Sequence, residues 1–437
     1  MARYFAESAL LADGWAEAVL FDVDELGFIA GIHTDLEPDA DTEKLSGSVI
    51  PGLTNAHCHS CLRAVAGRPD AFATHSGALH TWRTKANALL NDLGPDEIEA
   101  IHAQAYLEMV KLGFTNVGEV QSIFRTPHGQ HYADTTEISQ RIIAAAHQVG
   151  IRLTLLPALD RAGEAGMRGR LDVDDLLAMT GSLHAQFGDE ANLRIGLAVC
   201  SLPAVGPEHL AMAVAGKQAQ YEMAPIHLSL AADLRDTTEI GMLLDDRLVD
   251  WLLSETPIDG RWCLVHASQI TPEEATQLAS SDAVIALCPI FSSALNLAPF
   301  PMAAYLAVGG NLAIGAGAPL TASPFEEIRA LMVRYRLMAK GPDLFSRLVS
   351  GGGQATGSVE TGLATGLPAD WLVLDRDHPS LLDAESDAIL QSLVFSGGAN
   401  PVRDVMIGGE WVIRDGYHAE EEPVLDAYRD AINQIEP

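Results

Sequence analysis

The sequence predicts an α/β protein in which a (β/α)8 barrel carries a small β-sandwich domain built from both ends of the chain. Two observations support this fold class. Between residues 51 and 368, eight short apolar runs alternate with amphipathic helical segments, which is the pattern of a closed parallel barrel. Residues 1–50 and 369–437 contain β-rich runs separated by turn residues, so we expect the two ends to form the small domain together.

The expected elements follow in order along the chain. The N-terminal segment predicts strands at residues 16–23 and 27–32. Residues 95–110 predict a helix, whose acidic first turn suits the helix dipole. Strands are also expected at residues 369–375 and on both sides of the hairpin signal Gly408-Gly409. The eight barrel strands are expected at residues 49–57, 114–120, 152–159, 193–199, 225–230, 261–267, 283–289 and 311–316.

The composition restricts the partners of the protein. A formal net charge of −32 over 437 residues excludes nucleic acid and anionic membrane, because like charges repel over the whole surface. No apolar run approaches the roughly 18 residues that span a bilayer, and the first residues lack a secretion-signal pattern. We therefore expect a cytoplasmic protein. Five scattered cysteines fit reduced thiols in that compartment.

Two histidines end the first expected barrel strand. Alternate residues of a strand point the same way, so His57 and His59 present two imidazoles to one pocket, which is a metal-ligand geometry. The alternative is a pair of polar residues at a strand end. The intervening Cys58 also starts a Cys-x-x-Cys pattern with Cys61, for which buried structural thiols are the expected role.

Several motifs together resemble the amidohydrolase superfamily, and most strongly its formimidoylglutamate deiminase group, the zinc-dependent iminohydrolases of bacterial histidine breakdown. The resemblance covers nearly the whole chain and implies the barrel with its terminal β domain. The motifs that carry it lie at residues 51–59, 63–67, 81–83, 113–119, 153–157, 259–267, 286–289 and 402–406.

The resemblance implies a metal site that this chain retains in part. In the family, zinc is held by the first-strand His-x-His, which matches His57 and His59, by a strand-five His and by a strand-eight Asp. The strand-five ligand position is Ser229 here, and the proton-shuttling Glu position is Ala232. Gly317 stands where the strand-eight Asp belongs. We therefore expect either no cofactor or weakly bound zinc.

The resemblance also implies altered substrate positions. The family's carboxylate-binding Arg after strand four is Pro203, and the nearby His is Cys200. Glu119 on the second strand is retained as a substrate contact or as a structural partner of an Arg or a backbone amide. Trp82 and Arg83 are expected as lid residues over the pocket.

Three further side chains remain candidates for chemistry. His266 matches the strand-six His that orients water and substrate in the family, and His227 keeps its place on strand five. Cys61 shares strand parity with His57 and His59, so a re-made thiol and imidazole site is a further alternative.

These observations leave three functional hypotheses. The first is a pseudoenzyme that acts as a binding or partner subunit, with a small-molecule ligand or a partner protein. The second is an enzyme with metal-independent or Cys/His chemistry in the old pocket, and the third is a surviving C–N hydrolase with weakly held zinc. Phe291 and Leu295 packed over the histidines would favour the first. The family resemblance also favours a homodimer.

Overall fold

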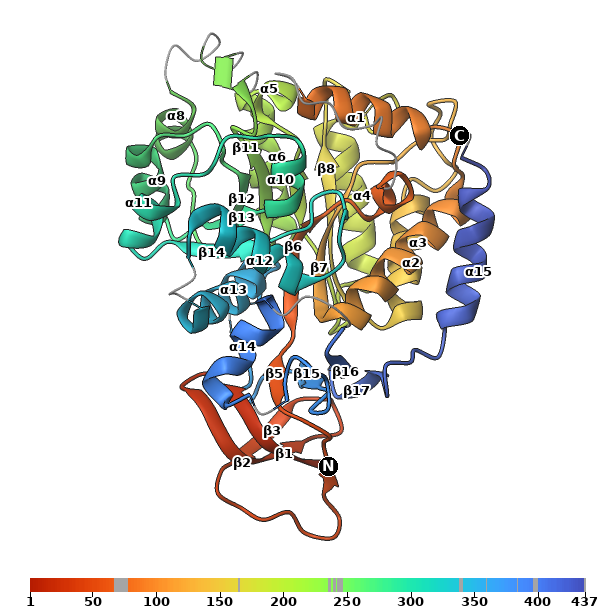
Figure 1. Ribbon diagram of the computed structural model, residues 1–437. Helices are drawn as coiled ribbons and strands as arrows, with labels where there is room; N and C mark the ends of the chain where they lie inside the picture. The colour runs from red at the N-terminus through yellow and green to blue at the C-terminus, as the bar shows by residue number, and fades with distance from the viewer. Residues whose placement is uncertain are drawn as a thin grey trace.

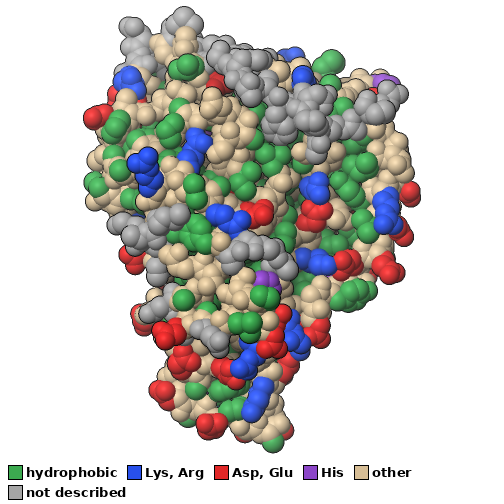
Figure 2. Space-filling model, in the orientation of Figure 1, with side chains coloured by type: hydrophobic (Ala, Val, Ile, Leu, Met, Phe, Trp, Pro, Cys, Tyr) green, Lys and Arg blue, Asp and Glu red, His purple; other side chains and the backbone are tan. Residues whose placement is uncertain are grey.

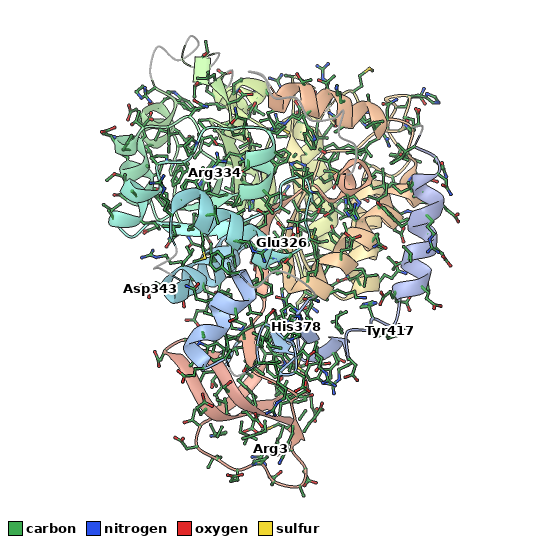
Figure 3. All side chains as sticks on the ribbon, in the orientation of Figure 1. Arg3, Glu326, Arg334, Asp343, His378 and Tyr417 are labelled. Carbon is green, nitrogen blue, oxygen red and sulfur yellow. The ribbon has the colours of Figure 1, made fainter. Side chains whose placement is uncertain are left out.

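A computed structural model gives the fold, with a barrel joined to a smaller terminal sheet (Figure 1). Figure 3 places Arg3 at the end of this sheet remote from the barrel and His378 at the boundary between the two. None of the helices that the structure describes is long and apolar enough to cross a membrane. The described residues are 1–66, 78–163, 166–234, 237–238, 241, 247–337, 341–358, 360–382, 384–395 and 400–435.

The barrel is a parallel sheet that closes almost completely, which confirms the predicted fold class. The last strand meets the first through a bridge between Cys58 and Gly317. The Gly317 N–H donates to the His57 carbonyl (2.9 Å), and the His59 N–H donates to the Gly317 carbonyl (2.8 Å). In spatial order, the strands are β6 (Leu53–Cys58), β7 (Phe114–Gln121), β8 (Arg152–Leu159), β10 (Leu197–Val199), β11 (Ile226–Leu230), β12 (Trp262–His266), β13 (Val284–Leu287) and β14 (Asn311–Ile314), and β9 (Leu193–Ile195) also pairs with β8.

Helices surround the barrel and extend over its upper end (Figure 1). The predicted helix at residues 95–110 is α2 (Pro95–Leu112), which begins with a proline in its first turn and ends at Gly113 in a left-handed conformation. The other elements of the barrel region are η1 (Ser60–Val65), α1 (Ala78–Leu89), α3 (Glu137–Val149), α4 (Val173–Phe187), α5 (Leu202–Val205), α6 (Pro207–Gln220), α8 (Leu248–Glu255), α9 (Pro272–Ala279), α10 (Pro289–Ala294), α11 (Met302–Ala307), α12 (Pro324–Tyr335) and α13 (Gly341–Ala355).

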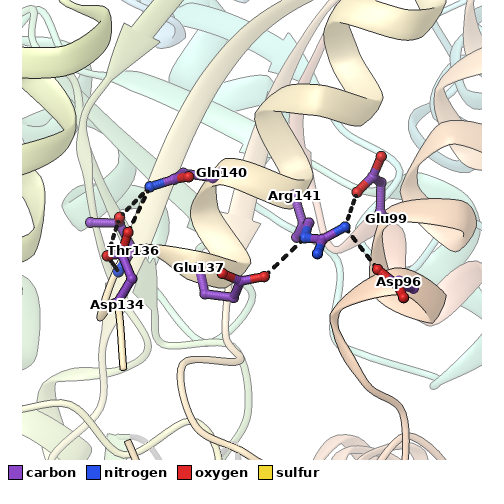
Figure 4. A network of polar contacts seen from close by, with 7 residues as sticks. All are labelled: Asp96, Glu99, Asp134, Thr136, Glu137, Gln140 and Arg141. Carbon is purple, nitrogen blue, oxygen red and sulfur yellow. Dashed lines mark hydrogen bonds and ion pairs between the residues drawn. The ribbon is translucent and has the colours of Figure 1, made fainter. Parts of the chain in front are cut away.

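A polar network joins the two helices α2 and α3 (Figure 4). Arg141 of α3 lies within 2.8 Å of Asp96 and 2.9 Å of Glu99, both on α2, and within 3.0 Å of Glu137 on its own helix. These carboxylates raise the pKa of Arg141. Because the network is partly exposed, it contributes less to stability than the apolar contacts between the same helices.

Both ends of the chain contribute to the terminal sheet, in the order β17-β16-β15-β5-β1-β2-β3 with β4 beside β1. Tyr4, Phe21 and Trp371 form its apolar core. Acidic side chains lie along the visible face of this lower part of the molecule in Figure 2. The strands are β1 (Ala2–Leu11), β2 (Gly14–Val23), β3 (Ile29–His33), β4 (Glu43–Lys44), β5 (Val49–Pro51), β15 (Trp371–Leu374), β16 (Val402–Ile407) and β17 (Glu410–Ile413).

Two helices follow strands of the terminal sheet but pack on the barrel. These are α14 (Ser386–Phe395), which contacts α12 and α13, and α15 (Glu421–Ile432), which lies along α2. Lys111 of α2 forms an ion pair of 2.5 Å with Glu421 of α15. The segment between β15 and β16 and the segment after β17 therefore add helices to the outer layer of the barrel.

Candidate functional site

A cavity of about 70 Å³ opens at the carboxyl ends of the barrel strands, under α1. This is the end at which barrel enzymes place their chemistry. The described residues that line it include four histidines, one arginine and no Asp or Glu. They are His57, His59, Leu62, Leu79, Trp82, Arg83, Ala86, Asn87, Val120, Ser122, Ala198, Val199, Cys200, His227, Ser229, His266, Phe291, Gly317 and Ala318.

The two histidines of the first barrel strand lie together at one wall of this cavity. The ring centroids of His57 and His59 are 5.1 Å apart, with the ring planes nearly perpendicular. A hydrogen bond from His59 to the Val120 carbonyl orients the second ring. Burial and the adjacent Arg83 lower the pKa of His59 to about 3. Burial likewise lowers the pKa of His57 far below its ordinary value, so both rings are neutral at pH 7.

The other two histidines, His227 and His266, also line this cavity. The His57 ring lies 6.3 Å from the His227 ring, with the planes nearly parallel, and 6.0 Å from the His266 ring. Nε2 of His227 donates to the Ala355 carbonyl (2.7 Å), which leaves its Nδ1 as an acceptor. Burial lowers the pKa of His227 to about 4, while burial and Arg83 lower that of His266 to about 3. Four neutral imidazoles therefore converge on one small space.

Gly317 lies against the aromatic ring of Phe291. A Cβ placed on Gly317 would lie 3.1 Å from Cδ1 and 3.2 Å from Cγ of Phe291, and 3.4 Å from Cβ of Cys288. The φ angle of Gly317 is +65°, which an L side chain adopts at a cost. The sequence thus has glycine where the backbone conformation disfavours an L residue and the neighbouring ring would have to shift to admit a Cβ.

Phe291 is held in this position from two sides. Its ring packs edge-on against Trp82 at 4.9 Å and lies 6.2 Å from the His266 ring. The preceding Ile290 N–H donates to Glu327 of α12 (3.0 Å), and burial raises the pKa of Glu327 to about 8. Leu295 is also buried, but it is not part of the cavity wall.

The strand-five positions are occupied by small side chains. Ser229 lines the cavity, and its buried Oγ has no hydrogen-bond partner within the described part of the chain. Ala232 is fully buried away from the cavity wall. Pro203 lies in the short helix α5, which likewise does not reach the wall.

Glu119 supports the site from outside the cavity. Its buried carboxylate accepts hydrogen bonds from the Ser60 N–H (2.8 Å) and the Ser60 hydroxyl (2.5 Å). His102 of α2 lies 3.4 Å from the same carboxylate. Glu119 therefore holds Ser60, the residue that follows His59, in place. A backbone amide is thus one partner of this carboxylate, which is one of the roles predicted from the sequence.

The two candidate thiols lie in different places. Cys200 lines the main cavity, whereas Cys61 is buried beside a separate cavity of about 10 Å³. Burial, and then the Glu119 carboxylate, raise the pKa of Cys61. None of the five cysteines, all of which the structure describes, forms a disulfide, and the Cys61 thiol stays protonated at neutral pH.

Comparison with known proteins places this arrangement in a family. The profile of the amidohydrolase family matches residues 48–412. The chain belongs to the amidohydrolase family. The profile of the formimidoylglutamate deiminase HutF N-terminal domain matches residues 1–46 of this amidohydrolase. These matches confirm the family predicted from the sequence.

Individual relatives match this amidohydrolase over its whole length. A curated formimidoylglutamate deiminase of Pseudomonas aeruginosa is 36% identical over 456 residues, which cover 100% of both chains. An amidohydrolase from Brucella melitensis has a crystal structure that superposes with a TM-score of 0.92 at 28% identity, with 100% of both chains covered. Atrazine chlorohydrolase TrzN from Arthrobacter aurescens shares the fold, with a TM-score of 0.84 at 19% identity over 99% of this chain and 100% of that one.

Several wall residues of this amidohydrolase were absent from the sequence prediction. Leu79, Ala86 and Asn87 line the cavity together with the predicted Trp82 and Arg83. These five positions on α1 have the spacing i, i+3, i+4, i+7 and i+8, which is one face of a helix. Helical periodicity, applied to the predicted lid residues, would have found the other three.

Within the part of this amidohydrolase that the structure describes, the side chains do not form the ligand set of a catalytic zinc ion. Catalytic zinc has three protein ligands and an open position. No group of three His, Cys, Asp or Glu side chains among the described residues has an arrangement that could hold a metal ion. His57 and His59 provide two imidazoles, but Ser229 and Gly317 provide neither an imidazole nor a carboxylate.

Proposed function

We propose that this chain is a divergent relative of formimidoylglutamate deiminase that binds a small polar molecule and does not hydrolyse C–N bonds through zinc. The observation that carries the proposal is the close packing of the Phe291 ring against Gly317. The space into which a strand-eight carboxylate would project is bounded by the Phe291 ring, which lies 3.1 Å from the site of its Cβ.

Zinc hydrolysis needs groups that this cavity lacks among its described residues. A metal-activated water must lose a proton to a base, and the leaving ammonia must gain one. Ser229 and Ala232 stand at the family's ligand and proton-shuttle positions, and the four lining histidines are neutral. The loss of the ligand, the shuttle and the strand-eight carboxylate supports a chain that has left this chemistry.

Binding remains within reach of the same cavity. Buried polar atoms of His57, His227, Ser229 and His266 have no hydrogen-bond partner within the described ranges. Such atoms are costly unless water or a ligand satisfies them. A small polar molecule in the 70 Å³ space would satisfy several of them at once.

The proposal is tested by metal analysis and a direct assay. The purified chain is incubated with zinc, dialysed, and analysed for metal, and ammonia release from N-formimino-L-glutamate is then measured. The curated Pseudomonas aeruginosa relative serves as the positive control. We expect far less than one zinc ion per chain and no ammonia release. About one ion per chain together with steady ammonia release would contradict the proposal.

A second candidate is an enzyme with metal-independent chemistry. It is favoured by Cys200, which lines the same cavity as the four imidazoles. A thiol beside an imidazole can act as a nucleophile with its base. Alkylation of Cys200 and the Cys200→Ser variant should then both abolish any turnover found with C–N substrates, and unchanged turnover would exclude the thiol mechanism.

We also propose that the chain forms a homodimer, which the family resemblance supports. Analytical ultracentrifugation of the full chain measures the mass directly. A sedimentation mass equal to twice the 46.6 kDa chain supports the dimer, and a mass equal to one chain contradicts it.

A further inference from the structure

A second, larger cavity lies at the other end of the barrel. It has a volume of about 540 Å³ and lies where the amino ends of the barrel strands face the terminal sheet. Thr54 of β6, Asn116 of β7 and Arg152 of β8 line it from the barrel, while Phe28 and Gly408 line it from the turns of the terminal sheet. Figure 1 shows this boundary between the lower ends of β6 and β7 and the strands β5 and β15. We call it the seam cavity.

One of the two arginines in the seam cavity is fully engaged. Arg152 donates to both carboxylate oxygens of Asp370, at 3.0 and 2.9 Å, which is the strong bidentate geometry. It also donates to the Ala191 carbonyl (3.1 Å) and to Oδ1 of Asn192 (2.5 Å). This pair joins the barrel to the terminal sheet, and Asp370 further accepts from the Gly408 N–H (2.6 Å).

The other arginine is not engaged. The half-buried side chain of Arg194 makes no hydrogen bond or ion pair with any residue that the structure describes, although it lines the same cavity. Its aliphatic part passes close to Gly357, where a Cβ would lie 3.3 Å from Cδ of Arg194. Burial, and then the positive charge of Arg152, lower the pKa of Arg194.

The charges around Arg194 leave it without a counter-ion among the residues that the structure describes. Asp370 is already paired with Arg152, and the other carboxylate of the cavity wall, Glu360, is exposed to solvent. A guanidinium with planar N–H donors suits a carboxylate or a phosphate, which it binds through two parallel hydrogen bonds. The neighbouring Asn116 is buried and lines the same space, and its side-chain N–H donates to the Thr356 hydroxyl (2.9 Å).

The remaining wall combines apolar side chains with hydroxyl and amide groups. Phe28, Val349 and Leu367 face the cavity, together with Pro51 and Pro368. Ligand pockets of roughly 300–1,000 Å³ with apolar walls and a few polar groups bind small organic molecules, and they are frequent at boundaries between domains. The seam cavity has a volume in this range, and its wall contains both apolar side chains and polar groups.

We propose that the seam cavity binds a small organic anion, with its carboxylate or phosphate on Arg194 and its apolar part against Phe28, Val349 and Leu367. This site is separate from the cavity of the four histidines, so it does not depend on the function proposed for that cavity. The bound anion would contact both the barrel and the terminal sheet.

Isothermal titration calorimetry of the full chain tests this with three probes of similar size. Benzoate and phenyl phosphate carry the two anionic groups, and benzamide is the neutral control. We expect at least one of the two anions to bind, and benzamide to bind at least roughly tenfold more weakly. The anion that binds more tightly shows whether the site prefers a carboxylate or a phosphate. Equal binding of anion and benzamide, or no binding of either anion, would overturn the proposal.

Variants locate the binding. Arg194→Gln should weaken anion binding roughly ten- to hundredfold, and Arg194→Lys, which keeps the charge, should weaken it less. The matched control is Arg429→Gln, because Arg429 is exposed and pairs with Asp426 on α15. Arg83→Gln tests the other cavity. Binding that is lost in Arg83→Gln and retained in Arg194→Gln would refute the proposed site.

Discussion

Adding a side chain at Gly317 tests how firmly the Phe291 ring occupies the space beside this residue. Gly317→Ala adds only the Cβ, at 3.1 and 3.2 Å from two ring atoms of Phe291, and forces an L residue to a φ of +65°. The backbone costs about 1–2 kcal/mol and the overpacking about 1–3 kcal/mol, so we expect a loss of about 2–5 kcal/mol in the free energy of unfolding. Gly317→Asp also buries a carboxyl group and should lose at least about 1 kcal/mol more.

Urea denaturation followed by tryptophan fluorescence measures these losses, and a double-mutant cycle assigns them. If the ring is the obstacle, Phe291→Leu should reduce the cost of Gly317→Ala by about 1–3 kcal/mol, because the two positions are in contact. Equal costs in both backgrounds, within about 0.5 kcal/mol, would refute the reasoning, since the backbone alone would then account for the loss. Wild-type stability of Gly317→Asp would refute it more directly.

Three further predictions concern buried groups around the site. Glu119→Gln, which removes a charged acceptor of two hydrogen bonds, should cost about 2–3 kcal/mol in urea denaturation, whereas the exposed Glu410→Gln should stay within about 0.5 kcal/mol of wild type. Burial raises the pKa of Glu327 from an ordinary value of 4.5 to about 8, so its contribution to stability is fully present below pH 4.5 and is lost as the pH rises through 8. Glu327→Gln should therefore be more stable than wild type above pH 8 and equal to it below pH 4.5. If the variant and the wild type had equal stability above pH 8 as well, the burial argument would be contradicted. In the native protein, an aromatic disulfide reagent should react first with the half-buried Cys200 and leave the four buried thiols unmodified. Unfolding in guanidinium should expose all five thiols to the reagent. Rapid reaction of more than one thiol in the native protein would contradict this prediction.

The strand pattern could be predicted from the sequence, but the division between sheets could not. The run at residues 49–57 is continuous and apolar, yet it is split between β5 and β6. At the split, the Gly52 N–H donates to the Asp370 carbonyl (3.1 Å), and the place of a Cβ on Gly52 is taken by the Thr115 side chain. The contact is between residues far apart in the chain, so no local pattern reports it.

The same limit applies to the site. His57 and His59 share a face because strand periodicity is local, and that could be predicted. The position of the Phe291 ring against Gly317 depends on the pairing of β13 with β14, because Phe291 follows the first of these strands and Gly317 follows the second. The sequence likewise indicated that Glu119 has a structural partner, but only the fold identifies it as Ser60.

The place of β5 between β1 and β15 has a consequence for biosynthesis. Residues up to Cys58 are translated roughly 300 residues before β15, a delay of about 15–60 s at 5–20 residues per second. During that time Tyr4 and Phe21 have no Trp371 to cover them. A nascent chain stalled before β15 would therefore present an uncovered aromatic face to chaperones and proteases, and completion of the terminal sheet would be the last step of maturation.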